Sequence, residues 1–390
     1  MARNIITGID IGTYQVKIIT VEHRKGEALT LPKIIGTGFS ESKGLRHGYI
    51  INSSDVAKSI RSAIEQVEEK THMHMKRAYL SIGGVGLEEV TSKGEVIISR
   101  ADGEITDLDI NKALEDSEEK VGVKISNRKI IHVIPLRFKI DGETVLGRPV
   151  GMRGSRLEVE VLFITCLEQH LNDLIQAVEE AGVEVDDVMA SPLAASLVTL
   201  TKAQKMAGCV LANIGSETVS TVVFEDNIPI SLKVFPIGST DITNDIALGL
   251  KISLEEAEQI KKGAITSTEY PKKKLDEIIV ARLSDIFELI ENHLKKIGKN
   301  GLLPAGIIMT GGGSGITTIE DLARAALKLP SKLASPRFGE NTKIKDASFA
   351  VAYGLCIWGL TAERSEHPMG IGLAFKTGGN LLRWVKQFLP

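Results

Sequence analysis

The sequence is poor in cysteine and aromatic residues, and neither charge is in clear excess. Of its 390 residues only 4% are aromatic, and the formal net charge is −3. This balance gives no reason to expect nucleic acid as a partner. The three cysteines, Cys166, Cys209 and Cys356, are widely spaced in apolar runs and form no CxxC pair or Cys/His cluster. We therefore expect buried free thiols in a reducing compartment and no structural metal.

A long hydrophobic run is also absent. The longest apolar stretch, at 349–360, is interrupted by Gly354 and Gly359 and is shorter than the roughly 20 residues that cross a bilayer. No signal-peptide pattern precedes the first strand-like segment. With 43% apolar and 25% charged residues, the composition is typical of a globular protein that can build large cores. We expect a soluble cytoplasmic protein that at most lies on a membrane surface.

Short apolar segments alternate with longer amphipathic ones, which predicts an α/β fold. Strands are expected at 5–8 and 16–21, with a tight turn at Gly12 between them. The apolar periodicity of 55–69 predicts a helix, for which Asn52, Ser53 and Ser54 are candidate caps. Further expected elements are strands at 95–98, 128–134 and 307–309, and helices at 108–121, 275–297 and 319–327.

One short pattern occurs twice. DIGT at 10–13 is matched by NIGS at 213–216, and each follows one apolar strand and precedes another. Two similar hairpins about 200 residues apart indicate two homologous lobes rather than a short-period repeat. The duplication therefore predicts a two-lobed architecture.

The residue types in these hairpins suit phosphate binding. A glycine at the turn lets successive backbone N–H groups approach phosphate oxygens, and Thr13 adds a hydroxyl donor. Lys17 lies just beyond the turn, and Asp10 is suited to holding Mg²⁺ through its water shell. One glycine hairpin alone is more often only a hairpin, whereas two in equivalent settings favour a ligand site.

A glycine loop follows a third strand. TGGGSG at 310–315 lies between the strand at 307–309 and the helix at 319–327, and its glycines allow close approach to a flat base or sugar. Such loops are common, so this one is weak by itself. The order DIGT, NIGS, TGGGSG matches the actin-like ATPase arrangement, which favours nucleotide binding over a purely structural role.

Three longer stretches resemble the bacterial cell-division family FtsA. They are FPIGSTDITNDIALGLKISLEEAEQIK at 235–261, RPVGMRGSRLE at 148–158 and HVIP at 132–135, and the resemblance extends over nearly the whole chain. It implies an α/β, actin-like two-lobed ATPase fold with an FtsA-type inserted subdomain in the first lobe. The implied division is 1–82 with 163–205 and 344–362 for lobe I, 83–162 for the insertion, 206–241 with 302–343 for lobe II, 242–301 for a helical partner-docking subdomain, 363–379 for a linker and 380–390 for a membrane-targeting helix.

The resemblance also implies ATP and Mg²⁺ as cofactors. Asp10 would act on the metal through water, and Glu258 and Lys261 would reach the ribose or base. The implied nucleotide-binding residues are Asp10, Gly12, Thr13, Tyr14, Gln15, Lys17, Asn213, Gly215, Ser216, Thr218, Gly238, Glu258, Lys261, Gly311, Gly312 and Gly313.

The second hairpin departs from the family pattern. Asn213 stands where an aspartate is usual, followed by Ser216 and Glu217 in place of a DIGGGT-like run, and Ser239 replaces a second glycine. Asparagine keeps the shape of aspartate but loses the negative charge that helps to fix magnesium and orient water. We expect ATP binding with weak or absent hydrolysis.

The segment 380–390 has the pattern of a short amphipathic helix. Its apolar face carries Leu381, Leu382, Trp384, Val385, Phe388 and Leu389, and Arg383 and Lys386 lie opposite. A tryptophan-bearing face opposed by basic residues suits the headgroup region of an anionic membrane. The alternative is a terminal helix packed on its own core, but the glycine-containing linker and the resemblance favour the membrane.

The family resemblance further implies self-assembly into filaments and binding of the FtsZ carboxy-terminal tail at 242–301, at the cytoplasmic side of the division site. Arg282, Lys295 and Lys296 are candidate contacts for that tail. A pilus-assembly relative of the PilM type is the main alternative, although it would not need an amphipathic tail. A superfamily kinase is a further alternative, but it would need a general base and a hydrolysis-competent second hairpin.

Overall fold

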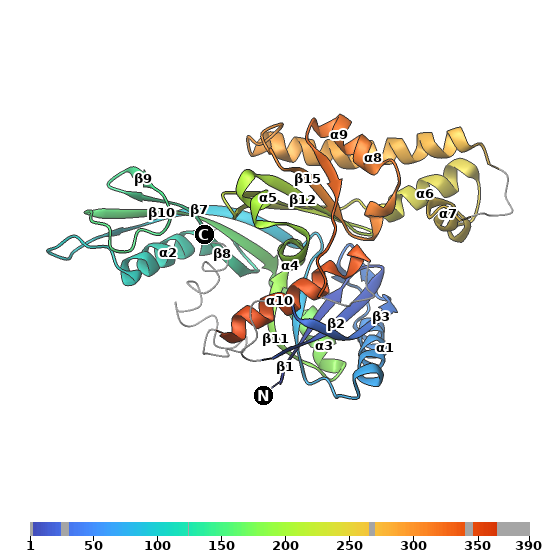
Figure 1. Ribbon diagram of the computed structural model, residues 1–390, viewed down its shortest axis with the longest axis horizontal. Coiled ribbons are helices and arrows are strands. Elements are labelled where there is room, and N and C mark those ends of the chain that lie inside the picture. The colour runs from blue at the N-terminus through green and yellow to red at the C-terminus, as the bar shows by residue number, and fades with distance from the viewer. Residues whose placement is uncertain (1–2, 25–30, 124, 265–269, 340–345, 365–390) are drawn as a thin grey trace.

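Two stacked lobes and a lateral extension make up the computed structural model (Figure 1). It describes residues 3–24, 31–123, 125–264, 270–339 and 346–364. The lobe I sheet has the order β11-β6-β1-β2-β3, and the lobe II sheet has the order β14-β13-β12-β15-β16. Their strands are β1 (Arg3–Ile11), β2 (Gln15–Arg24), β3 (Lys33–Glu41), β6 (Arg77–Ile82), β11 (Glu184–Ala190), β12 (Cys209–Ile214), β13 (Val219–Glu225), β14 (Ile228–Phe235), β15 (Gly306–Thr310) and β16 (Ser331–Leu333).

The two sheets have the same topology. In each, the first strand pairs antiparallel with the second and parallel with the fourth, as in β1–β2 and β1–β6 or β12–β13 and β12–β15. The third strand is antiparallel to the second and the fifth is parallel to the fourth. This correspondence confirms the α/β fold and the two homologous lobes predicted from the repeated hairpin.

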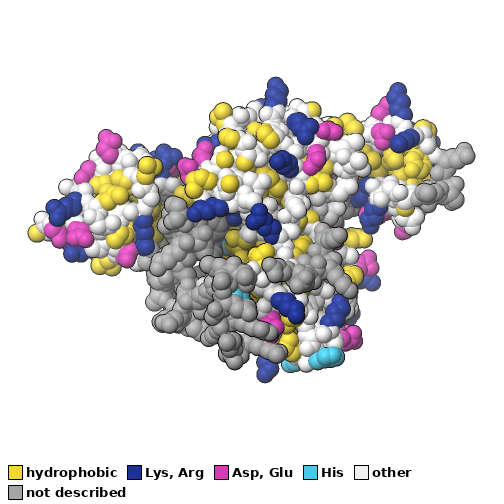
Figure 2. Space-filling model, viewed as in Figure 1, with side chains coloured by type: hydrophobic (Ala, Val, Ile, Leu, Met, Phe, Trp, Pro, Cys, Tyr) yellow, Lys and Arg dark blue, Asp and Glu magenta, His cyan; other side chains and the backbone are white. Residues whose placement is uncertain are grey.

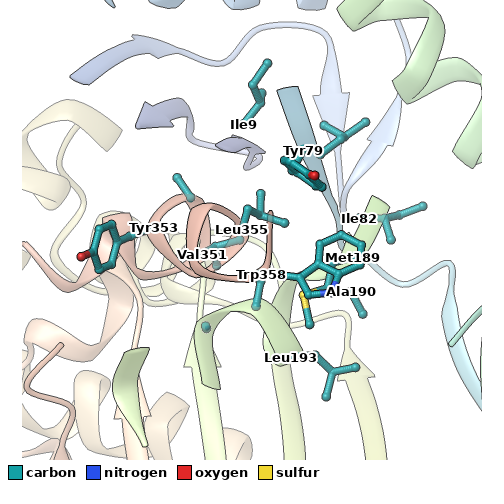
Figure 3. Packing of buried hydrophobic residues seen from close by; sticks show 14 of the residues in the cluster. Ile9, Tyr79, Ile82, Met189, Ala190, Leu193, Val351, Tyr353, Leu355 and Trp358 are labelled. Carbon is teal, nitrogen blue, oxygen red and sulfur yellow. The ribbon is translucent and has the colours of Figure 1, made fainter. Parts of the chain in front are cut away.

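Helices cover both faces of the lobe I sheet. The helices α1 (Ser53–Thr71) and α3 (Glu168–Glu180) lie on one side, and α4 (Ser191–Thr199) and α10 (Ala350–Arg364) lie on the other (Figure 1). Asn52 caps α1, as predicted, by accepting a hydrogen bond from the Asp55 backbone N–H at 3.3 Å. Figure 3 shows Trp358 of α10 beside Tyr79, with ring centroids 5.5 Å apart and an edge-on geometry. Because α4 also contacts β12 and β13, it connects the two lobes.

The outer face of the lobe II sheet is covered by helices with a separate hydrophobic core. Their apolar periodicity buries one stripe of each helix and leaves charged residues outside. The remaining helices of the two lobes are α5 (Lys202–Ala207), α6 (Ser239–Leu250), α7 (Leu254–Lys261), α8 (Lys272–Lys296) and α9 (Ile319–Leu327). Two short 3₁₀ turns are η1 (Gly312–Gly315) and η2 (Ala347–Phe349), which directly precedes α10.

The lateral extension is a four-stranded antiparallel sheet with one helix on it and its own hydrophobic core. Its strand order is β7-β10-β8-β9. The elements are β7 (Leu87–Ile97), α2 (Asp107–Gly122), β8 (Arg128–Ile140), β9 (Glu143–Val145) and β10 (Arg156–Leu167). A small hairpin of β4 (Leu45–Arg46) and β5 (Tyr49–Ile50) precedes α1.

Several predicted boundaries were wrong. The strand predicted at 95–98 is only the end of the longer β7, whose first half was missed because runs of consecutive polar residues hide any apolar alternation there. The linker predicted at 363–379 starts too early, because α10 continues as a helix to Arg364. The rest of that linker and the predicted membrane helix at 380–390 lie outside the described residues.

Cys166, Cys209 and Cys356 are buried and free, as predicted. Within the described ranges, no helix combines the length and the hydropathy that crossing a bilayer requires.

Candidate nucleotide-binding site

The two glycine hairpins face a single cavity of about 720 Å³ between the lobes. Each turn is closed by the same backbone hydrogen bond, from Gly12 N–H to Gln15 O at 3.1 Å and from Gly215 N–H to Thr218 O at 2.9 Å. The bonds align the two loops residue by residue, so Asp10 corresponds to Asn213. Fifteen of the sixteen predicted nucleotide-binding residues line this cavity, and the exception is Gly238.

Gly238 supports the second hairpin from behind instead. A Cβ atom at this position would lie 2.3 Å from the carbonyl oxygen of Ser216, so only glycine permits this approach of the two backbones. Ser239 N–H and Thr240 N–H then donate to the carbonyls of Gly215 and Ser216, at 2.9 and 2.7 Å. The N-terminus of α6 is thereby fixed beside the second hairpin, where its dipole favours an anion.

Asp10 is the charged centre of the first hairpin. It pairs across the strands with Lys17, a buried residue, and its carboxylate accepts a hydrogen bond from Ser81 Oγ at 2.7 Å. Burial raises the pKa of Asp10, and the Lys17 charge and the Ser81 hydroxyl offset only part of that increase. A divalent cation would favour the ionised form of this carboxyl, and one carboxylate with phosphates and water is a usual Mg²⁺ environment.

The second hairpin has uncharged residues at the corresponding positions. Asn213 pairs with Ser220 on β13 and with Thr310 on β15. Its Oδ1 lies 2.3 Å from the place that a Cβ of Gly311 would occupy, and Gly311 has a left-handed φ of 89°. The asparagine side chain therefore lies against the glycine loop, which needs glycine there. Thr310 Oγ1 is buried and has no hydrogen-bond partner.

Glu258 and Lys261 belong to a closed network on α6 and α7. Lys261 Nζ donates to Glu258 Oε2 at 2.6 Å, Thr243 Oγ1 at 2.7 Å and Ser239 O at 3.0 Å. Burial raises the pKa of Glu258, but the hydrogen bonds from Lys261 and Thr243 outweigh it and the pKa is lowered overall. Because an ammonium has three N–H donors, a ribose or base contact from Lys261 would replace one of these bonds.

The cavity also has walls that the sequence patterns did not indicate. Gly48 from the β4–β5 turn and the pair Gly83 and Gly84 after β6 line it, as do Thr240 and Asn244 of α6. The adjacent glycines after a buried strand were a usable signal, whereas Gly48 had none. Among the described residues, no three His, Cys, Asp or Glu side chains are grouped to hold a metal ion. Magnesium would thus depend on Asp10 together with the phosphates.

The inserted subdomain is hydrogen-bonded to both lobes. In lobe I, His132 Nε2 of β8 accepts a hydrogen bond from Ala190 N–H at 3.0 Å, directly before the cavity-lining Ser191. Burial lowers the pKa of His132 to about 3, so the ring is neutral and can accept. In lobe II, Glu89 of β7 accepts from Leu232 N–H at 2.6 Å and from Ser231 Oγ at 2.9 Å.

Two of the three predicted partner residues on α8, Arg282 and Lys295, form ion pairs within the fold. Arg282 Nε lies 2.7 Å from Asp245 Oδ2, and Lys295 Nζ lies 2.9 Å from Glu291 Oε2. Lys296 lies near Glu89 and His293, whose pKa values it affects. On the face of the molecule in view, Lys and Arg side chains are interspersed with Asp and Glu side chains (Figure 2).

Comparison with known proteins places this architecture in a family. A family model described as "Cell division protein FtsA" matches residues 210–354, and one described as "SHS2 domain inserted in FTSA" matches residues 84–165. The chain is 31% identical to the cell division protein FtsA of Borreliella burgdorferi over 382 residues, which cover 92% of this chain and 91% of that one. It is 30% identical to FtsA of Bacillus subtilis over 394 residues, covering 95% and 86%.

Solved structures support the same fold. The PilM–PilN type IV pilus biogenesis complex matches with a TM-score of 0.68 and 17% identity, covering 91% of this chain and 98% of that one. MreB5 of Spiroplasma citri bound to ADP matches with a TM-score of 0.52 and 13% identity, covering 93% and 98%. At these identities the matches show a shared actin-like fold and nothing more. The sequence relatives, which cover almost the whole chain, establish that it belongs to the FtsA family of cell division proteins.

Proposed function

We propose that this protein binds ATP with Mg²⁺ between its lobes, assembles with copies of itself, and tethers FtsZ filaments to the cytoplasmic face of the membrane at the division site. The observation that supports nucleotide binding most directly is the pair of matched hairpins on one cavity in a chain of the FtsA family.

The phosphate site combines backbone and side-chain groups. The N–H groups around Gly12 and Gly215 and the N-terminus of α6 hold the phosphates, and the glycines of 311–313 cover the adenosine. Bound magnesium would neutralise phosphate charge, with Asp10 holding its water shell. Lys17 balances the Asp10 carboxylate and favours its charged form despite its burial.

Hydrolysis is weak in this proposal because the positions of lobe II that match Asp10 and its neighbours are uncharged. Asn213, Ser220 and Thr310 offer only neutral groups where a negative charge would orient an attacking water. Glu217 is the carboxylate of this hairpin, but it bonds to lobe I and does not line the cavity.

Calorimetric titration and phosphate release, measured on the same preparation, test this assignment. We expect one ATP per chain, binding that weakens when Mg²⁺ is chelated, and turnover far below the roughly 1 s⁻¹ of ordinary enzymes. If the protein binds no ATP, the proposed nucleotide site is wrong. If it hydrolyses ATP rapidly at steady state, the proposal that the second hairpin limits hydrolysis is wrong.

We place FtsZ docking on the helical segment 242–301. The paired Arg282 and Lys295 lie on α8, so an acidic tail would compete with Asp245 and Glu291 for them. A synthetic FtsZ tail peptide should bind at low salt and more weakly at high salt. Replacing Arg282 and Lys295 together by Ala should weaken binding about tenfold, and the control Lys58→Ala in lobe I should not change it.

Membrane attachment rests on 380–390, which lies outside the described residues. Single short helices bind membranes weakly, so filament avidity supplies the remaining affinity. Deleting 380–390 should abolish co-sedimentation with vesicles that contain anionic lipid. Trp384→Glu, which keeps the length, should do the same, and sedimentation that survives both changes would contradict the tether.

A further inference from the structure

The tips of the two phosphate hairpins each extend a long side chain to the opposite lobe. The matched turn bonds make Tyr14 of the first hairpin equivalent to Glu217 of the second. Tyr14 reaches from lobe I to Lys262 at the end of α7 in lobe II, and Glu217 reaches from lobe II to the β4–β5 turn in lobe I. Two equivalent positions thus make reciprocal contacts across one cleft, although their side chains are chemically unrelated.

The Glu217 contact joins two anchored loops. Its Oε2 accepts the backbone N–H of His47, and its backbone carbonyl lies 3.2 Å from His47 Nδ1. His47 has a left-handed φ of 49°, and its carbonyl accepts from Val85 N–H at 3.2 Å, which ties the turn to lobe I. A charged acceptor on a fixed N–H is a stronger hydrogen bond than a neutral one.

The second contact joins Tyr14 of the first hairpin to the end of α7. Lys262 Nζ lies 5.5 Å from the centre of the Tyr14 ring, within cation–π range, and 3.1 Å from Glu258 Oε1. Burial opposes the charge of Lys262, but Glu258 and Tyr14 raise its pKa, so the ammonium persists. The Tyr14 backbone is itself held by Ser42 N–H at 2.9 Å.

Both contacts border the cavity, which Tyr14, Lys262, Gly48 and Ser216 line. We propose that Tyr14 and Glu217 are reciprocal clasps that hold the lobes closed and set the rate at which bound nucleotide leaves. The proposal rests on nucleotide binding in this cavity. A nucleotide that leaves between the lobes must separate them and break both contacts. Because the two clasps form only when the lobes are closed, they slow dissociation more than they change association.

Glu217 gives the cleaner test because it contacts His47 and does not line the cavity. Protein loaded with radiolabelled ATP and Mg²⁺ is chased with unlabelled ATP, and retained label is followed on filters. Glu217→Ala should release ATP about tenfold faster, as expected for loss of one charged hydrogen bond, while the association rate changes little. Glu217→Gln keeps an acceptor oxygen, so its ATP release rate should lie between those of wild type and Glu217→Ala.

Tyr14 is tested by paired substitutions. Tyr14→Ala should release ATP about threefold faster than wild type, and Tyr14→Phe, which keeps the ring but loses the hydroxyl bonded to Lys262, should have an intermediate rate. Combining Glu217→Ala with Tyr14→Ala should multiply the two effects, because release requires both clasps to open.

Hydrogen exchange supplies a readout that needs no nucleotide. The backbone amide of His47 should exchange faster in Glu217→Ala than in wild type, and Glu217→Gln should restore much of the protection. If wild type binds ATP but Glu217→Ala releases it at an unchanged rate, the clasp is overturned and the nucleotide site stands. If wild type binds no ATP, the proposed function fails, and His47 exchange alone then decides whether Glu217 joins the lobes.

Discussion

The hairpins at Asp10 and at Asn213 share a backbone and differ in charge. Both have the same closing hydrogen bond and the same position in matching sheets. The first holds an Asp–Lys pair with a serine donor, and the second holds asparagine, serine and an unpartnered threonine. The fold thus tolerates either set, because strand pairing and glycine turns determine the backbone while side chains determine what it binds.

The difference assigns unequal roles to the lobes. In our proposal, lobe I carries the metal-related charge, and lobe II positions phosphates with backbone N–H groups and the N-terminus of α6. In this proposal ATP is bound but hydrolysed slowly, because only the first hairpin carries a carboxylate at the cavity. Substitutions in both hairpins and at the subdomain junction test how far the asymmetry extends.

The largest effect is expected from making the first hairpin resemble the second. Asp10→Asn removes the carboxylate that would hold magnesium and leaves Lys17 buried without its partner charge. We expect Mg·ATP affinity to fall at least about 100-fold in calorimetry. The matched change Asn213→Ala should weaken Mg·ATP binding only about threefold. Equal losses of affinity in the two variants would contradict the unequal roles proposed for the two hairpins.

The second largest effect is expected on stability, from the buried His132 of the inserted subdomain, which accepts a hydrogen bond from lobe I. His132→Ala leaves the Ala190 N–H without an acceptor and should lower the free energy of unfolding by about 2 kcal/mol. Urea denaturation at pH 7.5 measures this loss. His132→Gln retains an acceptor oxygen and should lose less, so equal losses would mean that the hydrogen bond is unimportant.

The same pair of proteins has a defined pH dependence. Burial lowers the pKa of His132 from 6.5 to about 3. Between pH 6.5 and about 3, this histidine is therefore protonated in the unfolded chain but neutral in the folded chain. This contribution to stability is complete above pH 6.5 and is lost as the pH falls toward about 3. Relative to His132→Gln, wild type should lose about 1.4 kcal/mol per pH unit in this window. If the difference in unfolding free energy between wild type and His132→Gln did not change with pH, His132 would not be the group that titrates.

A smaller effect is expected from the reverse conversion of the second hairpin. Asn213→Asp places a negative charge on the wall of the cavity where lobe I has Asp10. ATP turnover should rise about tenfold, measured as phosphate release under saturating Mg·ATP. Unchanged turnover with unchanged affinity would show that the second hairpin does not limit hydrolysis.

The smallest effects should differ in sign between the lobes. Ser81→Ala removes the donor to Asp10 and should destabilise the protein by about 1 kcal/mol. Thr310→Val removes a buried hydroxyl that has no partner and should stabilise it by a similar amount. Thermal unfolding of both variants checks this. A loss of stability in Thr310→Val would indicate that the hydroxyl has a partner.

Much of the fold was predictable because its signals are local. Glycine turns between apolar strands predicted both hairpins, and periodicity predicted α1 and α9. The early half of β7 was missed because its polar residues stand in consecutive runs and leave no apolar alternation. The position of Gly238 behind the hairpin was also missed, because a glycine that permits a backbone approach and one that faces a ligand look alike in sequence.

The sequence by itself determined the repeated hairpin, the family and the three glycine-bearing segments that meet at the cavity. Only the tertiary structure decided which of these residues have other partners. Lys261 directs its three donors to neighbours, Thr310 has no hydrogen-bond partner, and Glu217 crosses to His47, 170 residues away in the chain. Strand and turn formation depend on nearby residues, whereas the pairing of a side chain depends on segments that meet only when both lobes have folded.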